Sequence, residues 1–179
     1  MPSFAYLFCE NNIRGKLNIE RLNKDGIPPG AAWGEIQKAN NIYLDDNRKI
    51  IATDYLLEPR TPRKVIIAGD NDTPSLLAEK SASIDVLVHE ATYTDAIAQK
   101  VGQGPQHSSA KLVAEFAESS AIKNLILMHF SSRFQDGDSA SPSINDIENE
   151  ARAHYSGNLF LANDLDVYTL DTTGYLNKR

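Results

Sequence analysis

The chain has 179 residues, enough for a domain with a substantial core, and 41% of them are hydrophobic and 23% charged, which excludes an intrinsically disordered protein. A net charge of -6 argues against bulk affinity for nucleic acid, so contact with any polyanion would need a local basic patch. The single cysteine excludes an internal disulfide, and with neither a signal-like start nor an apolar run of about 20 residues the sequence predicts a cytoplasmic protein without a membrane span.

The first sixty residues are predicted to form short elements. Residues 3–9 are apolar and aromatic, which favours a buried strand, and Cys9 at its end is interpreted as a packed thiol rather than a nucleophile. Short helices are expected at 16–25 and 31–38, on either side of a rigid turn that contains two prolines. Residues 42–51 are predicted to form a β-hairpin.

From residue 64 onward, apolar runs typical of strands alternate with helical patterns. The predicted strands are 64–68, 85–89, 123–128, 158–162 and 166–170, and the predicted helices are 74–80, 92–100, 108–120 and 143–155. This alternation predicts a layered α/β architecture.

Three of the predicted strands lead into an acid or an imidazole, at the point where α/β folds build their sites. Asp70 follows the first strand, His89 and Glu90 the second, and His129 the third. Asp70 can bridge two cations, and His129 can offer a ring nitrogen to one of them. The pair His89-Glu90 can supply a proton. Each has an ordinary alternative, such as a turn for Asp70 or a hydrogen-bonded edge residue for His129.

Two polar loops are predicted to contact phosphate. His107 and Ser108 stand at the start of a predicted helix, where backbone N–H groups and hydroxyls can hold an anion. Ser131 and Ser132 precede Arg133, whose guanidinium can clamp a phosphate through two hydrogen bonds. Together with the strand ends, these loops indicate a metal or phosphate site.

The segment 11–40 is slightly basic within an acidic chain. It holds five basic and three acidic residues. From charge alone, an ordinary solvated surface explains this balance better than a binding face.

Four motifs occur in the order seen in a known family. They are Gly69-Asp70, His89-Glu90-Ala91-Thr92, His107-Ser108-Ser109 and His129-Phe130-Ser131-Ser132-Arg133-Phe134. With them, the chain resembles the second half of ribonuclease Z, the tRNA 3′-processing endonuclease family of the metallo-β-lactamase superfamily. The resemblance covers nearly the whole chain and extends to Gly15-Lys16-Leu17-Asn18, Gly26-Ile27-Pro28-Pro29-Gly30 and Ala162-Asn163-Asp164. It implies an α/β fold that is half of an αββα sandwich, one mixed sheet with flanking helices over residues 1–179, with the N-terminal half absent.

The resemblance also implies roles for individual residues. Asp70 matches the aspartate that bridges two zinc ions, and His129 matches a terminal zinc ligand. His89 and Glu90 match a loop implicated in protonating the leaving group. The positions expected near the scissile phosphate and acceptor stem are His107, Ser108, Ser131, Ser132 and Arg133. Residues 11–40 match an arm that grips tRNA, through basic residues that would include Arg14, Lys16, Arg21 and Lys24.

The sequence departs from the family in one major respect. The His-x-His-x-Asp-His motif that supplies most zinc ligands does not occur, so we expect weak or absent zinc binding and little activity from the chain alone. Half a sandwich also leaves an apolar sheet face open, which we expect a second copy or the missing N-terminal half to cover. Two local departures, Gly69-Asp70-Asn71-Asp72 and Gly30-Ala31, leave room for another phosphodiester substrate.

Two alternatives remain open. The chain could be a metallo-hydrolase of another phosphodiester, assembled across a homodimer with Asp70 and His129 from both copies. It could instead be a non-enzymatic RNA-binding or interaction module that keeps the arm and the phosphate loops.

Overall fold

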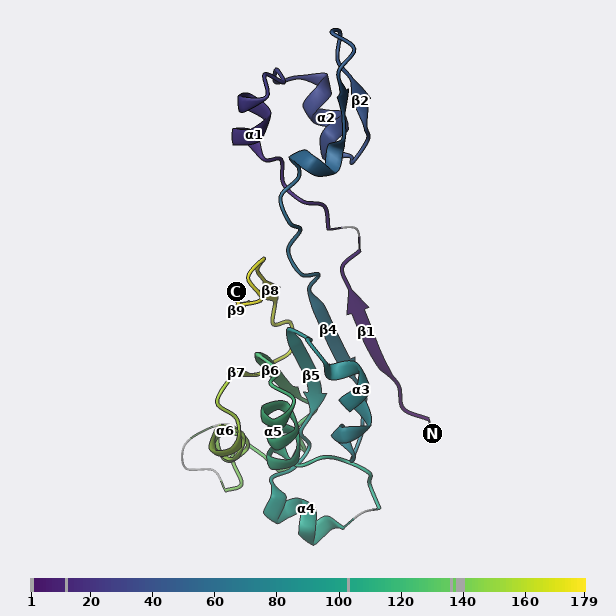
Figure 1. Cartoon of the computed structure of the whole chain (residues 1–179). Coiled ribbons are helices and arrows are strands. Elements are labelled where there is room, and N and C mark those ends of the chain that lie inside the picture. Colours follow the sequence, from purple (N-terminus) through teal and green to yellow (C-terminus); the bar gives the residue numbers. More distant parts are fainter. Residues whose placement is uncertain (1, 12, 103, 136, 138–140) are drawn as a thin grey trace. The chain divides into compact units, whose positions relative to one another are not determined.

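The computed structural model describes residues 2–11, 13–102, 104–135, 137 and 141–179 (Figure 1). Two compact units divide the chain. The first combines Met1–Cys9 with Arg63–Arg179, and the second is Glu10–Pro62. None of the helices described in either unit has the length and apolar character that a membrane crossing needs.

The first unit is built on a five-stranded mixed sheet in the order β1-β4-β5-β6-β7. Its strands are β1 (Ala5–Cys9), β4 (Lys64–Ala68), β5 (Val86–Glu90), β6 (Asn124–Met128) and β7 (Asn158–Leu161). Strands β4 to β7 run parallel, and β1 pairs antiparallel with β4. A hairpin of β8 (Tyr168–Leu170) and β9 (Leu176–Lys178) follows. The predicted α/β architecture with one mixed sheet and flanking helices is confirmed.

Helices connect the parallel strands, as a parallel sheet requires. They are the 3₁₀ turn η2 (Pro74–Leu77), α3 (Ala78–Ser81), α4 (Asp95–Val101), α5 (Ala110–Ser119) and α6 (Ile144–His154). The Ser109 side chain caps α5 by accepting a hydrogen bond from the N–H of Leu112. A reciprocal capping box of Ser143 and Asp146 starts α6.

The two faces of the sheet pack differently because side chains alternate along each strand. Leu87, Leu125 and Leu127 form the main core with Val113 of α5 and Ile147 of α6, so these leucines lie on the face that the two helices cover. On the opposite face, a smaller cluster joins sheet residues to the C-terminal hairpin. Its buried members are Val86, Ile126 and Leu176.

At the β1 end, this second face is open. On this face, Tyr6 of β1 pairs with Ile67 of β4, and Phe8 pairs with Val65. Tyr6, Phe8 and Ile67 are 61%, 56% and 40% exposed. The expectation that residues 3–9 form a strand is confirmed for β1, but its predicted burial is wrong, because all five residues of β1 are exposed at the edge of the sheet. Cys9 is likewise exposed rather than packed.

The second unit has its own small core. It contains α1 (Ile19–Lys24), α2 (Ala31–Gln37), the hairpin strands β2 (Ile42–Tyr43) and β3 (Lys49–Ile50), and the 3₁₀ turn η1 (Ala52–Tyr55). The buried residues are Leu22, Ile27, Ile36, Ile50, Ala52 and Tyr55. The basic segment 11–40 therefore folds together with the predicted hairpin; within it, Asn12 lies outside the described residues.

Candidate metal and phosphate site

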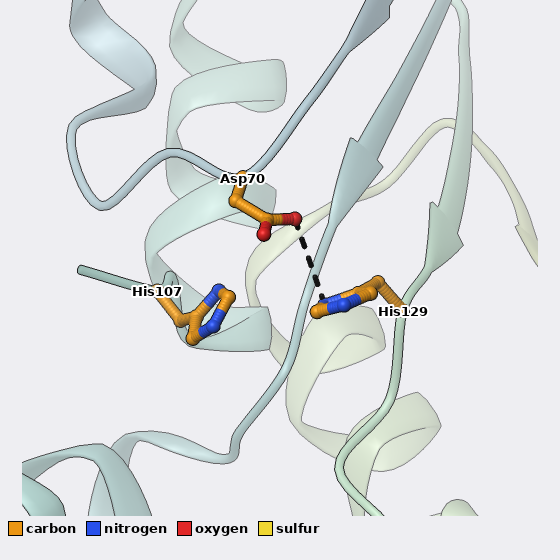
Figure 2. A group of neighbouring side chains, drawn as sticks. All are labelled: Asp70, His107 and His129. Atoms are coloured by element: carbon orange, nitrogen blue, oxygen red, sulfur yellow. Dashed lines mark ion pairs between the residues drawn. The ribbon is translucent and has the colours of Figure 1, made fainter. Parts of the chain in front are cut away.

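Three side chains converge at one edge of the first unit's sheet (Figure 2). Asp70 follows β4, His107 precedes α5 and His129 follows β6, and one ligand atom of each lies within 4.8 Å of the others. Asp70 Oδ1 is 3.8 Å from His129 Nδ1, and the two imidazole rings have centroids 5.2 Å apart. The carboxyl ends of parallel strands meet at one edge, which explains the convergence of Asp70 and His129.

The donor set suits a divalent metal ion. A carboxylate oxygen and imidazole nitrogens are ligands that zinc accepts, and three protein ligands are the usual number in a catalytic zinc site. Asp70 and His129 are about half exposed as side chains, at 55% and 50%, so solvent reaches them. His107 adds a third candidate ligand that sequence analysis placed only with phosphate. Three ligands suffice for one ion and are too few for two.

His129 has an unusual backbone. Its φ is 59°, in the left-handed region that residues with a side chain rarely adopt. The chain around it is fixed by β-like contacts: the N–H of Ala91 donates to the carbonyl of Met128, and the N–H of Ser131 donates to the carbonyl of Thr92. The surrounding structure thus holds His129 in a conformation that its own preference opposes.

A single buried carboxylate connects the loops of this site. Glu90 has 0% exposure, and its Oε1 accepts from the backbone N–H groups of Asn71 and Ser108, at 3.3 and 2.6 Å. Its Oε2 accepts from the N–H and the hydroxyl of Thr92, at 2.9 and 2.7 Å. A buried carboxylate is tolerated only when its lone pairs are satisfied, and Glu90 meets that condition by joining three separate segments.

His89 lies inside the unit and is not one of the three converging residues. It is 0% exposed, its Nδ1 donates to the carbonyl of Glu90 at 2.7 Å, and its Nε2 is 3.4 Å from Asn71 Nδ2. Burial lowers the pKa of His89 below its ordinary value, although the carbonyl and carboxylate of Glu90 oppose that shift. His89 is therefore neutral at pH 7, with both nitrogens engaged.

The groups at the start of α5 that are predicted to contact phosphate form hydrogen bonds within the protein instead. The N–H of Ser108 donates to Glu90, and its hydroxyl donates to the carbonyl of Asn71. The next N–H groups also have partners: Ala110 donates to Tyr93, Lys111 to Glu150, and Leu112 to Ser109. This helix start therefore leaves no free N–H group at these positions for an anion.

The Arg133 loop is more accessible. Arg133 and Ser132 are exposed, and Ser131 is half-buried with its Oγ 3.3 Å from a guanidinium nitrogen of Arg133. The guanidinium carbon lies 5.9 Å from the centre of the Tyr93 ring, which meets the His107 ring edge-on at 6.1 Å. Tyr93 thus links the basic loop to the trio.

Sequence reasoning missed the contributions of Asn71, Thr92 and Tyr93. Thr92 and Tyr93 are only 4% and 8% exposed, and Asn71 is half-buried. The available signal was the polar run that continues past the apolar strand β5, since polar residues in a buried segment need specific partners.

The predicted arm residues lie in the second unit. Arg14, Lys16, Arg21 and Lys24 are all exposed there. Arg21 and Lys24 belong to α1, and the guanidinium of Arg21 lies 5.2 Å from the centre of the Tyr55 ring.

Comparison with known proteins identifies the relatives of this chain. It is 49% identical over 178 residues to ribonuclease Z from Marinobacter nauticus, 45% identical to ribonuclease Z from Pseudomonas putida W619, and 33% identical to ribonuclease Z from Brevibacillus brevis. The matches cover 99%, 99% and 92% of this chain, and 55%, 55% and 51% of those proteins. No protein-family model matches it.

Solved structures resemble the chain only partially. A metallo-beta-lactamase fold protein from Bacillus subtilis gives a TM-score of 0.46 at 17% identity, covering 65% of this chain and 40% of that one. The short form of human tRNase Z gives 0.40 at 28% identity, covering 57% and 31%. The relationship thus rests on sequence: along nearly its whole length this chain belongs with ribonuclease Z, and it spans about half the length of the curated relatives it matches.

Proposed function

We propose that this chain carries one side of the metal centre of a ribonuclease Z-type phosphodiesterase that acts on the 3′ end of precursor tRNA. The observation that carries the proposal is the convergence of Asp70, His107 and His129 at one sheet edge. The relatives named ribonuclease Z support the reaction class and the substrate.

In this proposal Asp70 and His129 hold zinc, with His107 beside them. Zinc bound there would polarise the phosphate and activate water. The family centre takes two ions, and the further ligands would come from the part of a ribonuclease Z-type protein that this chain does not span. We therefore expect the chain alone to bind zinc weakly and to show little or no turnover.

The exposed groups next to the trio fit the handling of a phosphodiester. Arg133, beside Tyr93, is free to clamp a phosphate, with Ser131 and Ser132 in the same loop. The basic residues of the second unit would contact tRNA phosphates. Salt-dependent RNA binding without cleavage, even after the remaining portion of a ribonuclease Z is added, would favour the alternative of a non-enzymatic module.

Protonation of the leaving oxygen is assigned by the family resemblance to His89 and Glu90, and this assignment stays a prediction. Both side chains are wholly buried, so they would act through their neighbours. His107 is the imidazole beside Asp70 and His129, and we propose that it contacts the substrate directly.

The exposed apolar face at β1 suggests how the centre is completed. Tyr6, Phe8 and Ile67 present apolar surface on one side of the sheet. We propose that the remaining portion of a ribonuclease Z-type protein covers it, because the relatives are nearly twice as long as their matched segment. A homodimer is the competing occupant.

The test is complementation. The purified chain is mixed with the portion of Marinobacter nauticus ribonuclease Z that it does not cover, and cleavage of a 3′-extended precursor tRNA is measured with added zinc. The mixture should cleave, while the chain alone and a mixture made with Asp70→Ala should not. Asp72→Ala, which removes an exposed acid two residues away, is the matched control and should cleave. Formation of the complex without cleavage would contradict the proposal.

A further inference from the structure

The hydroxyl of Thr92 lies between Glu90 and His129. Thr92 Oγ1 is 2.7 Å from Glu90 Oε2, 3.0 Å from the carbonyl oxygen of His129 and 3.0 Å from His129 Nδ1. Thr92 is only 4% exposed, so water does not readily replace these contacts.

The direction of the third contact follows from counting protons. A threonine hydroxyl has one proton to donate. Two acceptors compete for it, the carboxylate of Glu90 and the carbonyl of His129, and the carboxylate is closer. Donation to the ring instead would leave the lone pairs of Thr92 Oγ1 and the Glu90 carboxylate facing each other at 2.7 Å with no proton between them, which is unfavourable, so no proton remains for the ring of His129. Nδ1 of His129 must then be the donor, with Thr92 Oγ1 as its acceptor.

Among the residues that the structure describes, no other hydrogen bond competes for that nitrogen. Asp70 Oδ1 is 3.8 Å from His129 Nδ1, beyond hydrogen-bond distance. The hydrogen-bonded chain therefore runs from the His129 ring to the Thr92 hydroxyl and on to the buried Glu90 carboxylate.

We propose that Thr92, held by Glu90, is a positioning residue that fixes the tautomer of His129. With its proton on Nδ1, the neutral ring keeps the lone pair of Nε2 for a metal ion. The hydrogen-bond chain exists without a metal, so the tautomer of His129 does not depend on the proposed function. Only the use of the Nε2 lone pair as a metal ligand rests on that function. In this proposal the buried Glu90 also orients His129 through Thr92, in addition to joining the loops.

The same threonine supports the backbone of His129. Its carbonyl accepts from the N–H of Ser131, and its hydroxyl reaches the carbonyl of His129. Thr92 thereby holds both the left-handed His129 and the segment that follows it, which restricts ring position as well as tautomer.

The first experiment is ¹⁵N NMR of the histidine side chains in the metal-free full chain, at about pH 8, where an ordinary imidazole is neutral. The His129 signals are assigned by their loss in His129→Ala. The unchanged chain and Thr92→Ser should show His129 protonated on Nδ1, and Thr92→Val should show this preference lost. Protonation of His129 on Nε2 in the unchanged chain would overturn the proposal, even if Thr92→Val failed to fold.

The second experiment measures zinc affinity of the same chains by calorimetry, after circular dichroism has shown that they are folded. Thr92→Val should bind zinc about 10–100-fold more weakly, and Thr92→Ser should recover affinity close to that of the unchanged chain. Equal affinity of all three would contradict the positioning role. Absence of zinc binding even in the mixture with the complementing portion of ribonuclease Z, with His129 still protonated on Nδ1, would count against the proposed function and leave the positioning of His129 standing.

Discussion

Glu90 Oε1 lies 3.7 Å from Nδ1 of His107, and this buried nitrogen has no hydrogen-bond partner among the described residues. A buried polar atom without a partner is costly, so a small movement that closes this gap would be favourable. The carboxylate that joins the loops is thus also placed to orient the imidazole beside Asp70 and His129.

This placement predicts that His107 contributes more to cleavage than His89 does. In the complemented enzyme, His107→Ala should lower kcat by about 100-fold or more, as expected for loss of a group that contacts the reacting phosphate. His89→Gln should lower it less, because His89 is buried with both nitrogens engaged. Single-turnover cleavage of precursor tRNA measures both. A larger loss from His89→Gln, in a folded protein, would return the proton-donor role to His89.

Glu90→Gln should destabilise the first unit. An amide keeps one oxygen acceptor but turns an NH₂ group toward two of the donors that Glu90 now satisfies, so buried groups lose partners. We expect a loss of about 3 kcal/mol in the free energy of unfolding, measured with urea.

The matched control is Glu148→Gln on α6. Glu148 pairs with Arg152 at 2.8 Å, but both side chains are partly exposed, so solvent screens the pair. Its loss should cost below about 1 kcal/mol. Equal costs for the two substitutions would show that Glu90 does not organise the loops.

The lowered pKa of His89 predicts a pH dependence of stability. The unfolded chain binds a proton on this residue below about pH 6.5, while folded His89 stays neutral to lower pH because it is buried. The unfolded state then holds more protons, and the free energy of unfolding falls as the pH decreases through this window, by at most about 1.4 kcal/mol per pH unit. Above about pH 6.5, the contribution of neutral His89 to the free energy of unfolding is fully present.

Urea unfolding at a series of pH values checks this sign. His89→Gln, which cannot titrate, should have a flatter profile than the unchanged chain as the pH falls below about 6.5. Parallel profiles would mean that His89 titrates alike in the folded and unfolded states.

Much of the first unit could be predicted from local pattern. The predicted strand 64–68 corresponds to β4, and the predicted helix 108–120 to α5, because continuous apolar runs and amphipathic periods are local properties. Burial of residues 3–9 was predicted wrongly, since an apolar run does not reveal that its strand lies at the sheet edge.

The site was predictable to a similar degree. Asp70 and His129 follow strands, and parallel strand ends meet at one edge by rule. Two features depend instead on tertiary packing between distant segments: the approach of His107 to them and the burial of Glu90. The short β9 was not predicted, because Leu176–Lys178 is too brief and polar to show alternation.

The exposed face of β1 predicts a binding defect. Phe8→Lys should weaken association with the complementing portion of a ribonuclease Z by about tenfold or more, because a buried aromatic contributes roughly 1.5–3 kcal/mol. Stability of the free chain should change by about 0.5 kcal/mol or less, since Phe8 is 56% exposed there. Calorimetric titration gives the affinity. Leu76→Lys, at a residue 76% exposed on η2, is the control, and an equal effect of both would exclude β1 as the contact.

The second unit predicts electrostatic binding of tRNA. Lys16→Glu combined with Lys24→Glu reverses two exposed charges of the predicted arm. Affinity for precursor tRNA should fall, and the dependence of log Kd on log salt should become shallower by about one per lost phosphate contact. Fluorescence anisotropy across a salt series measures both quantities.

Lys80→Glu combined with Lys100→Glu makes the same change in net charge on exposed helical positions of the first unit. If the arm contacts phosphates directly, this control should lower affinity only slightly and leave the slope unchanged. Identical slopes for the two double variants would instead indicate a general effect of net charge, and the basic residues of 11–40 would then be ordinary solvated surface.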